Sequence, residues 1–215
     1  MPNYVFITFT VLGTKNCLNQ FVQQARGTCK ITEDLSDRIR YFVNHEESSF
    51  DFNCLVPLPE EYSKVPYSPN WQDPQSPNGY DMELQTWGVK WGAFDVEGPI
   101  ITYSSETYSS ATYTFICAFS APRVFCEKLS RKWADLFFIV SYGGEGPTLG
   151  CFTLYNGKYI NSIDRALNES PRYPEGDNIS EDAEEKWSES YTAWEQQYRQ
   201  AHEIYVTTIK TYLID

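Results

Sequence analysis

The chain has 215 residues, a formal net charge of −12 and 41% hydrophobic residues, which is typical of one globular domain with additions or of two small domains. The negative charge argues against nucleic-acid backbones and anionic membranes as partners, because both carry the same sign. Aromatic residues are abundant, with 16 Tyr, 13 Phe and 6 Trp, and such side chains suit interaction surfaces as well as cores.

The first residues, MPNYVFITFTVLG, contain no basic residue before a short apolar run. We therefore expect no export signal and no membrane segment. The six cysteines form no C-x-x-C pair, and we expect them to be buried free thiols in a reducing compartment.

Hydrophobic periodicity predicts a strand at 3–12 and a helix at 15–26, and a second helix follows at 32–43. The run FDFNCLV, 50–56, is predicted to be a short strand. Residues 57–80 contain six prolines, which exclude a long helix or a central strand and indicate a loop insertion suited to binding. Further strands are expected at 95–104, 112–119, 136–142 and 151–155, with a helix at 122–134.

A long C-terminal helix is predicted from about Ser180. Its aromatic residues alternate in steps of four and three, which gives one narrow seam for helix packing. That seam can dock on its own domain or pair with a second copy in a homodimer. It consists of Trp187, Tyr191, Trp194, Tyr198, Ala201, Tyr205, Thr208 and Tyr212.

The order strand, helix, strand, strand, helix, strand predicts an α+β, ferredoxin-like βαββαβ fold, an antiparallel sheet with helices on one face. The Pro-rich insertion at 57–80 and the long C-terminal helix are additions to it. We divide the chain into a ferredoxin-like domain at 1–160 and an acidic linker with the aromatic helix at 161–215.

Three segments resemble the Api92-like proteins of phages and plasmids, a group that includes the YubB-type ferredoxin-like domain. They are FDFNCLVPLPEEY, WGVKWGAFD and SAPRVFCEKLSRKWADLFFIVSYGGEG, in this order along the chain. The WG-x-KW match is the most specific of the three. The resemblance implies a protein of a mobile genetic element in the cytoplasm of a bacterial host, and it carries over no catalytic residue.

The segment WGVKWGAFD is a candidate ligand site, with Trp87, Lys90 and Trp91 joined by Glu145 from the loop YGGEG. On a helical turn both tryptophans would share one face, with the lysine covering a ring. The alternative, which we favour, is a structural junction in which Gly92 permits a sharp exit into the next strand.

Residues 169–195 hold nine acids against Arg172 and Lys186, so more than half of the net charge lies there. Acids beside tryptophan and tyrosine predict a surface that binds a basic partner protein, because aromatic residues are frequent hot spots. The predicted binding residues are Trp187, Tyr191, Trp194, Tyr198, Glu181, Asp182, Glu184, Glu185 and Glu189.

Catalytic chemistry has little support, because the only histidines, His45 and His202, fit no metal or catalytic motif. We predict no catalytic residue, no metal site and no cofactor. A hydrolase that uses Glu145, His45 or a cysteine stays open. A basic cluster on the 122–134 helix would suit nucleic acid or a solvated face: Arg123, Lys128, Arg131 and Lys132.

The sequence thus predicts a non-enzymatic accessory protein of a phage or plasmid. It would bind and inhibit a host protein, such as a defence or nucleic-acid-handling enzyme, through its acidic aromatic surface. The alternative is a small-ligand-, nucleotide- or RNA-binding ferredoxin-like module.

Overall fold

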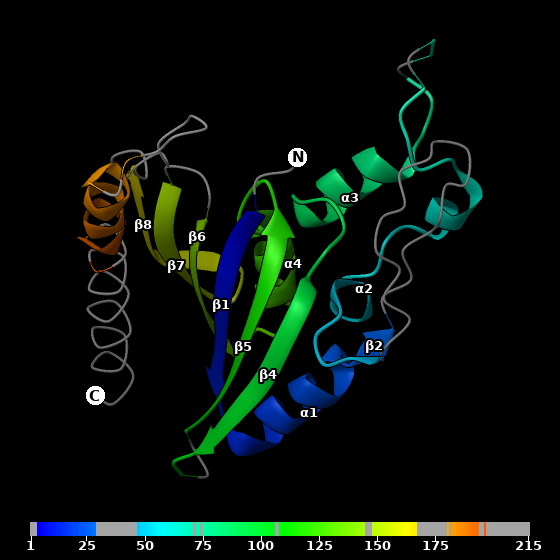
Figure 1. Ribbon diagram of the computed structural model, residues 1–215. Helices are drawn as coiled ribbons and strands as arrows, with labels where there is room; N and C mark the ends of the chain where they lie inside the picture. The colour runs from blue at the N-terminus through cyan, green and yellow to red at the C-terminus, as the bar shows by residue number, and fades with distance from the viewer. Residues whose placement is uncertain are drawn as a thin grey trace.

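The computed structural model describes residues 4–28, 47–70, 72–73, 75–105, 108–144, 148–166, 180, 182–193 and 196. Its centre is a six-stranded, fully antiparallel sheet in the order β4-β5-β1-β6-β7-β8 (Figure 1). The strands are β1 (Tyr4–Gly13), β4 (Phe94–Tyr103), β5 (Ser109–Ala118), β6 (Phe137–Gly144), β7 (Thr148–Tyr155) and β8 (Lys158–Ala166). The short strands β2 (Gly27–Thr28) and β3 (Glu47–Ser48) form a separate pair.

Five helices accompany these strands: α1 (Lys15–Ala25), α2 (Phe52–Leu55), the 3₁₀ helix η1 (Glu60–Lys64), α3 (Gly79–Trp87) and α4 (Arg123–Lys132). Residues 182–193 are also helical. Figure 1 shows α1–α3 toward the β4 end of the sheet and residues 182–193 beyond β8, at its other end. No helix among the described residues is long and apolar enough to cross a membrane.

The main core lies between the sheet and α1–α4, and aromatic rings fill it. Alternate residues of β1, such as Ile7 and Phe9, point into this core, as strand pleating requires. Phe50 stacks on Phe115 of β5 with centroids 5.1 Å apart, and Phe52 stacks on Phe125 of α4 at 3.7 Å. The residues before and within α2 therefore hold α4 against the sheet.

The α+β class, the antiparallel sheet and the strands predicted near 3–12, 95–104, 112–119, 136–142 and 151–155 are confirmed. The sheet has six strands, whereas the sequence predicted the four strands of a βαββαβ core extended by the strand at 151–155. One of them, β8, was not predicted and spans the proposed domain boundary at residue 160. The predicted helix at 32–43 lies outside the described residues.

The strand predicted at 50–56 is wrong, because this segment contains the one-turn helix α2. Asp51 caps it by accepting a hydrogen bond from the Asn53 N–H at 2.7 Å. Phe52 and Leu55, three positions apart, are both buried, which is helical spacing. The Asp51 cap therefore stabilises a helix in a segment whose aromatic content favours a strand.

The helical turn considered for WGVKWG is also wrong. Helix α3 ends at Trp87, and Gly88 follows in the left-handed region at φ +77°. Trp91 and Gly92 are left-handed as well, at φ +69° and +67°. The segment is thus a tight irregular turn, and the four-residue spacing of its tryptophans does not place them on one helix face.

Candidate functional site

Helix α3 links the Pro-rich insertion to the WGVKWG turn. The Asn78 side chain caps it, accepting from the Asp81 N–H at 2.9 Å and donating to the Asp81 carboxylate at 2.8 Å. The middle of the insertion lies against the first turn of α3. The N–H groups of Gly79 and Tyr80 donate hydrogen bonds to the carbonyls of Pro66 and Tyr67. The insertion is therefore anchored at its C-terminal end.

A buried carboxylate on α3 connects three segments. Glu83 is 2% exposed and accepts hydrogen bonds from the hydroxyls of Tyr62 at 2.8 Å and Tyr67 at 3.1 Å. It also accepts from the backbone N–H of Trp91 at 2.8 Å. We call Glu83, Tyr62, Tyr67 and Trp91 the Glu83 cluster. It ties the insertion, through Tyr62 of η1 and Tyr67, and the tryptophan turn to one acidic group on α3.

Burial dominates the electrostatics of this cluster. It raises the pKa of Glu83, and the three donated hydrogen bonds and the positive charge of Lys90 only partly oppose that rise. Burial, followed by the nearby Glu83 carboxylate, raises the pKa of Tyr67 far above its ordinary value. The Tyr67 hydroxyl therefore stays protonated and acts as a donor to Glu83.

Lys90 lies between two aromatic rings beside this cluster. Its Nζ is 3.7 Å from the centroid of the Trp91 ring and 4.5 Å from that of Phe119, which is 51% exposed. Burial lowers the pKa of Lys90, while Glu83 acts in the opposite direction. The cation–π contact predicted for Lys90 is present, although its geometry comes from a turn and not from a helix face.

Trp87 lies in the main core and is 5% exposed. Its indole N–H donates to the Val56 carbonyl at 2.8 Å, and its ring meets Phe52 edge to face at 5.7 Å. The structure therefore places Trp87 in the core, Trp91 in the Glu83 cluster and Lys90 beside that cluster. Glu145, the fourth predicted ligand residue, lies outside the described residues, so the predicted ligand site stays a prediction.

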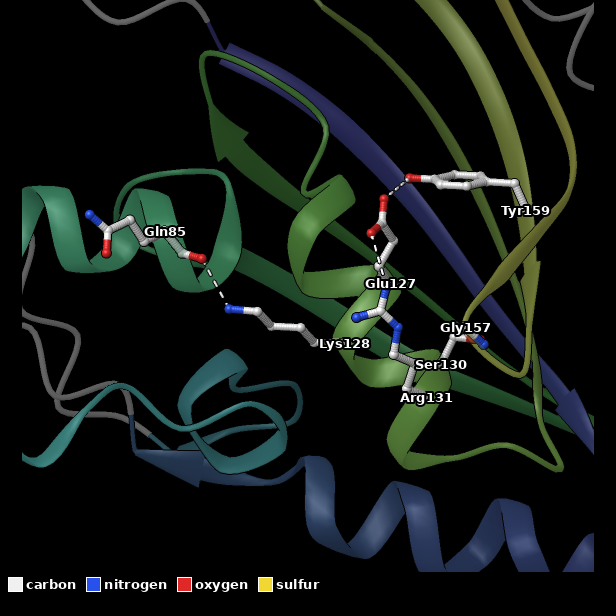
Figure 2. Close-up of polar contacts among 7 residues, drawn as sticks. All are labelled: Gln85, Glu127, Lys128, Ser130, Arg131, Gly157 and Tyr159. Atoms are coloured by element: carbon white, nitrogen blue, oxygen red, sulfur yellow. Dashed lines mark hydrogen bonds and ion pairs between the residues drawn. The ribbon is translucent and has the colours of Figure 1, made fainter.

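The basic residues of α4 make contacts within the protein (Figure 2). Lys128 donates to the Gln85 carbonyl of α3 at 3.0 Å, and Lys132 donates to the Leu55 carbonyl of α2 at 3.0 Å. Arg131 pairs with Glu127 at 3.6 Å. These contacts connect α4 to its neighbours, while Arg131 and Lys132 remain exposed.

Two further contacts hold the β7–β8 hairpin on α4. Glu127 accepts from the Tyr159 hydroxyl at 2.9 Å, and the Ser130 hydroxyl accepts from the Gly157 N–H at 3.0 Å (Figure 2). On the same side the Arg123 guanidinium lies 4.5 Å from the centroid of the Phe152 ring.

The helix at residues 182–193, which we call the acidic helix, carries part of the predicted binding surface. The side chains of Asp182, Glu184, Glu185 and Glu189 are all exposed. Trp187 is half-buried and stacks on Tyr191 with centroids 5.2 Å apart. Glu181, Trp194 and Tyr198 lie outside the described residues.

Sequence reasoning missed Glu83 and its two tyrosine partners. A charged residue at a buried helix position breaks the apolar pattern that marks a core face, and its partners precede it by 21 and 16 positions. The tyrosines in PEEY and VPY were a weak signal, because aromatic residues in a Pro-rich segment often anchor the chain.

No group of three His, Cys, Asp or Glu side chains in the described part of the chain is placed to hold a metal ion. The described cysteines are free thiols, and burial raises the pKa of Cys117 and Cys126. No family model, no curated protein and no solved structure matches this chain. The resemblance to the Api92-like proteins stays a prediction from the sequence.

Proposed function

We propose that this protein is a binding module whose acidic helix attaches to a basic surface of a partner protein and thereby inhibits that partner. One observation carries the proposal: the four carboxylates of the acidic helix all face solvent. Only one cation, Lys186, lies within the same helix, and it pairs with Asp182 at 2.8 Å. With four acids and one lysine, residues 182–193 carry a formal net charge of −3.

The field of this charge accelerates association with an oppositely charged surface and acts over about 8 Å at physiological salt. The aromatic pair beside it would supply contact area, since Tyr191 is 40% exposed and is supported by the Trp187 ring. Acids that steer association and an adjacent tyrosine that adds buried area are a common combination in protein–protein recognition.

Protein is a better partner than nucleic acid for two reasons. The net charge of −12 opposes a polyanion, and Lys128, Arg131 and Lys132 of α4 are engaged in contacts within the chain. A small-ligand site at Lys90 and Trp91 has weaker support, because Lys90 packs on the Trp91 ring and the Trp91 N–H is bonded to Glu83.

The resemblance to Api92-like proteins supports a phage or plasmid origin, with a host defence or nucleic-acid-handling enzyme as the partner. The chain order β1, α1, β4, β5, α4, β6 supports a ferredoxin-like core, which β7 and β8 would extend. Both are parts of the proposal.

Affinity capture from bacterial lysate tests it, using tagged protein at low and high salt. The wild-type chain should retain a specific partner at low salt and lose it at high salt. The variant E184Q/E185Q/E189Q should lose most of that capture. A control with the same charge change elsewhere, E61Q/D73N/D95N, should retain it, and the purified partner's activity should fall as wild-type protein is added.

Two results would overturn the proposal. One is the absence of any specific partner at either salt concentration. The other is a partner that both triple variants retain equally, because binding would then not depend on the acidic helix.

A further inference from the structure

The Pro-rich insertion contributes little to the core. No described side chain between residues 57 and 77 is buried, whereas Leu55 before the insertion and Asn78 near its end both are. Leu58 is the one described residue of this stretch that packs against the main core, and it is only partly buried. A segment with so few apolar contacts can open locally while the rest of the domain stays folded.

Polar contacts hold the insertion on α3 instead. Two backbone hydrogen bonds join residues 66–67 to the first turn of the helix. Two side-chain hydrogen bonds, from the hydroxyls of Tyr62 and Tyr67, both end on the carboxyl group of Glu83. The same group also accepts from the Trp91 N–H. One titratable side chain therefore joins the insertion, α3 and the tryptophan turn.

A neutral Glu83 can keep all three of these partners. Its Oε2 lies 3.1 Å from the Tyr67 hydroxyl and 2.8 Å from the Trp91 N–H, and it can accept from both as a carbonyl oxygen. Its Oε1 lies 2.8 Å from the Tyr62 hydroxyl and, when protonated, can donate to it, because a hydroxyl can also accept. The closed arrangement thus needs no buried charge.

An ionised Glu83 is less favourable in the closed arrangement. Its side chain is buried, and the charged group that attracts it is Lys90, which lies over the Trp91 ring. The tyrosine hydroxyls face it from the insertion, and Lys128 of the neighbouring helix α4 is bound to a backbone carbonyl of α3. Burial outweighs these contacts and raises the pKa of Glu83. Opening of the insertion returns that pKa towards about 4.3, the value of a hydrated carboxyl group.

We propose that the Pro-rich insertion is a strap that Glu83 holds closed on α3 while neutral and releases when it ionises. The sign follows from hydration of the carboxylate: the open state binds fewer protons, so rising pH favours it. Opening should increase about tenfold for each pH unit between the ordinary carboxyl pKa and the raised one, and should be constant above the raised value. Below about pH 4.3 both states carry a neutral Glu83, and the strap is held most firmly.

Amide hydrogen exchange of the full-length chain, followed by NMR spectroscopy from about pH 5 to 8, tests this proposal. The N–H groups of Gly79 and Tyr80 report the strap, because they donate to the carbonyls of residues 66–67 while it is closed. The amides of β5 report the core. Each rate is divided by the intrinsic rate at the same pH, so the ratio measures opening. In wild-type protein this ratio should rise about tenfold per pH unit at the strap within that window and stay constant in β5.

Glu83→Gln should remove this pH dependence, because its amide imitates the neutral acid. Glu61→Gln, a matched change at an exposed position of η1, should keep it. Equal pH profiles in wild type and Glu83→Gln would overturn the proposal, as would strap amides that open only together with β5.

Should Glu83→Gln also expose β5, Tyr62→Phe replaces it. This variant removes one of the two tyrosine hydrogen bonds and should raise opening at every pH, and an unchanged ratio would contradict the strap. Exchange is measured without a partner, so this proposal and capture through the acidic helix can fail independently.

Discussion

The Glu83 cluster predicts a large and specific loss of stability when its carboxylate is removed. Glu83→Ala leaves three part-buried donors, the hydroxyls of Tyr62 and Tyr67 and the Trp91 N–H, without this acceptor. An unsatisfied buried donor costs about 1–3 kcal/mol, although water entering the space can satisfy part of the set. We expect the free energy of unfolding to fall by about 3–5 kcal/mol.

Glu83→Gln separates shape from charge. The amide oxygen can take the position of Oε2, which accepts from Tyr67 and Trp91, while the amide N–H donates to the Tyr62 hydroxyl. The tyrosine hydroxyls can donate or accept, whereas the Trp91 N–H can only donate. One orientation of the amide therefore satisfies all three partners. The expected loss is about 1–2 kcal/mol.

The effect of pH has a defined sign. The pKa of Glu83 is raised by folding, so its contribution is full below the ordinary carboxyl pKa of about 4.3 and decreases as pH rises through the raised value. Glu83→Gln lacks this titration. The stability difference between wild type and Glu83→Gln should therefore shrink as pH rises from 4 towards neutrality.

Urea denaturation followed by tryptophan fluorescence at several pH values measures these differences. Glu61→Gln, at an exposed position of η1, is the matched control and should change stability by less than about 0.5 kcal/mol. The reasoning would be refuted if Glu83→Ala cost no more than the control, or if the deficit of Glu83→Gln grew with rising pH.

Substitutions at three other positions test local geometry by the same denaturation assay. Gly88→Ala should cost about 1–2 kcal/mol, because the residue is at φ +77° and a Cβ would lie 3.0 Å from Val124 Cγ2; an unchanged midpoint would argue against the left-handed helix end. Trp87→Phe should cost about 2 kcal/mol through the lost bond to the Val56 carbonyl and the smaller ring, and a neutral result would mean that this bond is not formed. Asp51→Ala should cost about 1 kcal/mol whereas Asp51→Asn should cost little, and equal losses would contradict a helix cap at this residue.

The sequence predicted an element well where one of its faces is apolar, because the pattern then lies within the element itself. The strand at β1 and the helix at α4 were predicted within one or two residues, because their buried residues follow periods of two and 3.6. Strand β8 was missed because an edge strand has few buried residues: Tyr159 is 39% exposed and Ile160 is 58% exposed. The pairing of β8 with β7 holds it in the sheet, and its own sequence therefore shows little periodicity.

The candidate site was harder to predict, because its chemistry depends on contacts between distant positions. The sequence singled out the WGVKWG segment, but the spacing of its tryptophans was interpreted through a helical period that ends at Gly88. Three left-handed residues within five positions curl the chain so that the Trp91 N–H reaches Glu83. Backbone conformation, and not side-chain spacing, therefore gives this motif its geometry.

The contact between Lys90 and the Trp91 ring likewise depends on the backbone conformation of the turn. Lys90 lies over the Trp91 ring only because the backbone reverses between Gly88 and Gly92. A substitution that straightens the turn would separate Lys90 from its aromatic neighbours and remove the Trp91 N–H from Glu83 at once. The anchored insertion and the cation–π pair thus depend on one local backbone conformation, and the effects of Gly88→Ala and Glu83→Ala on stability should be less than additive.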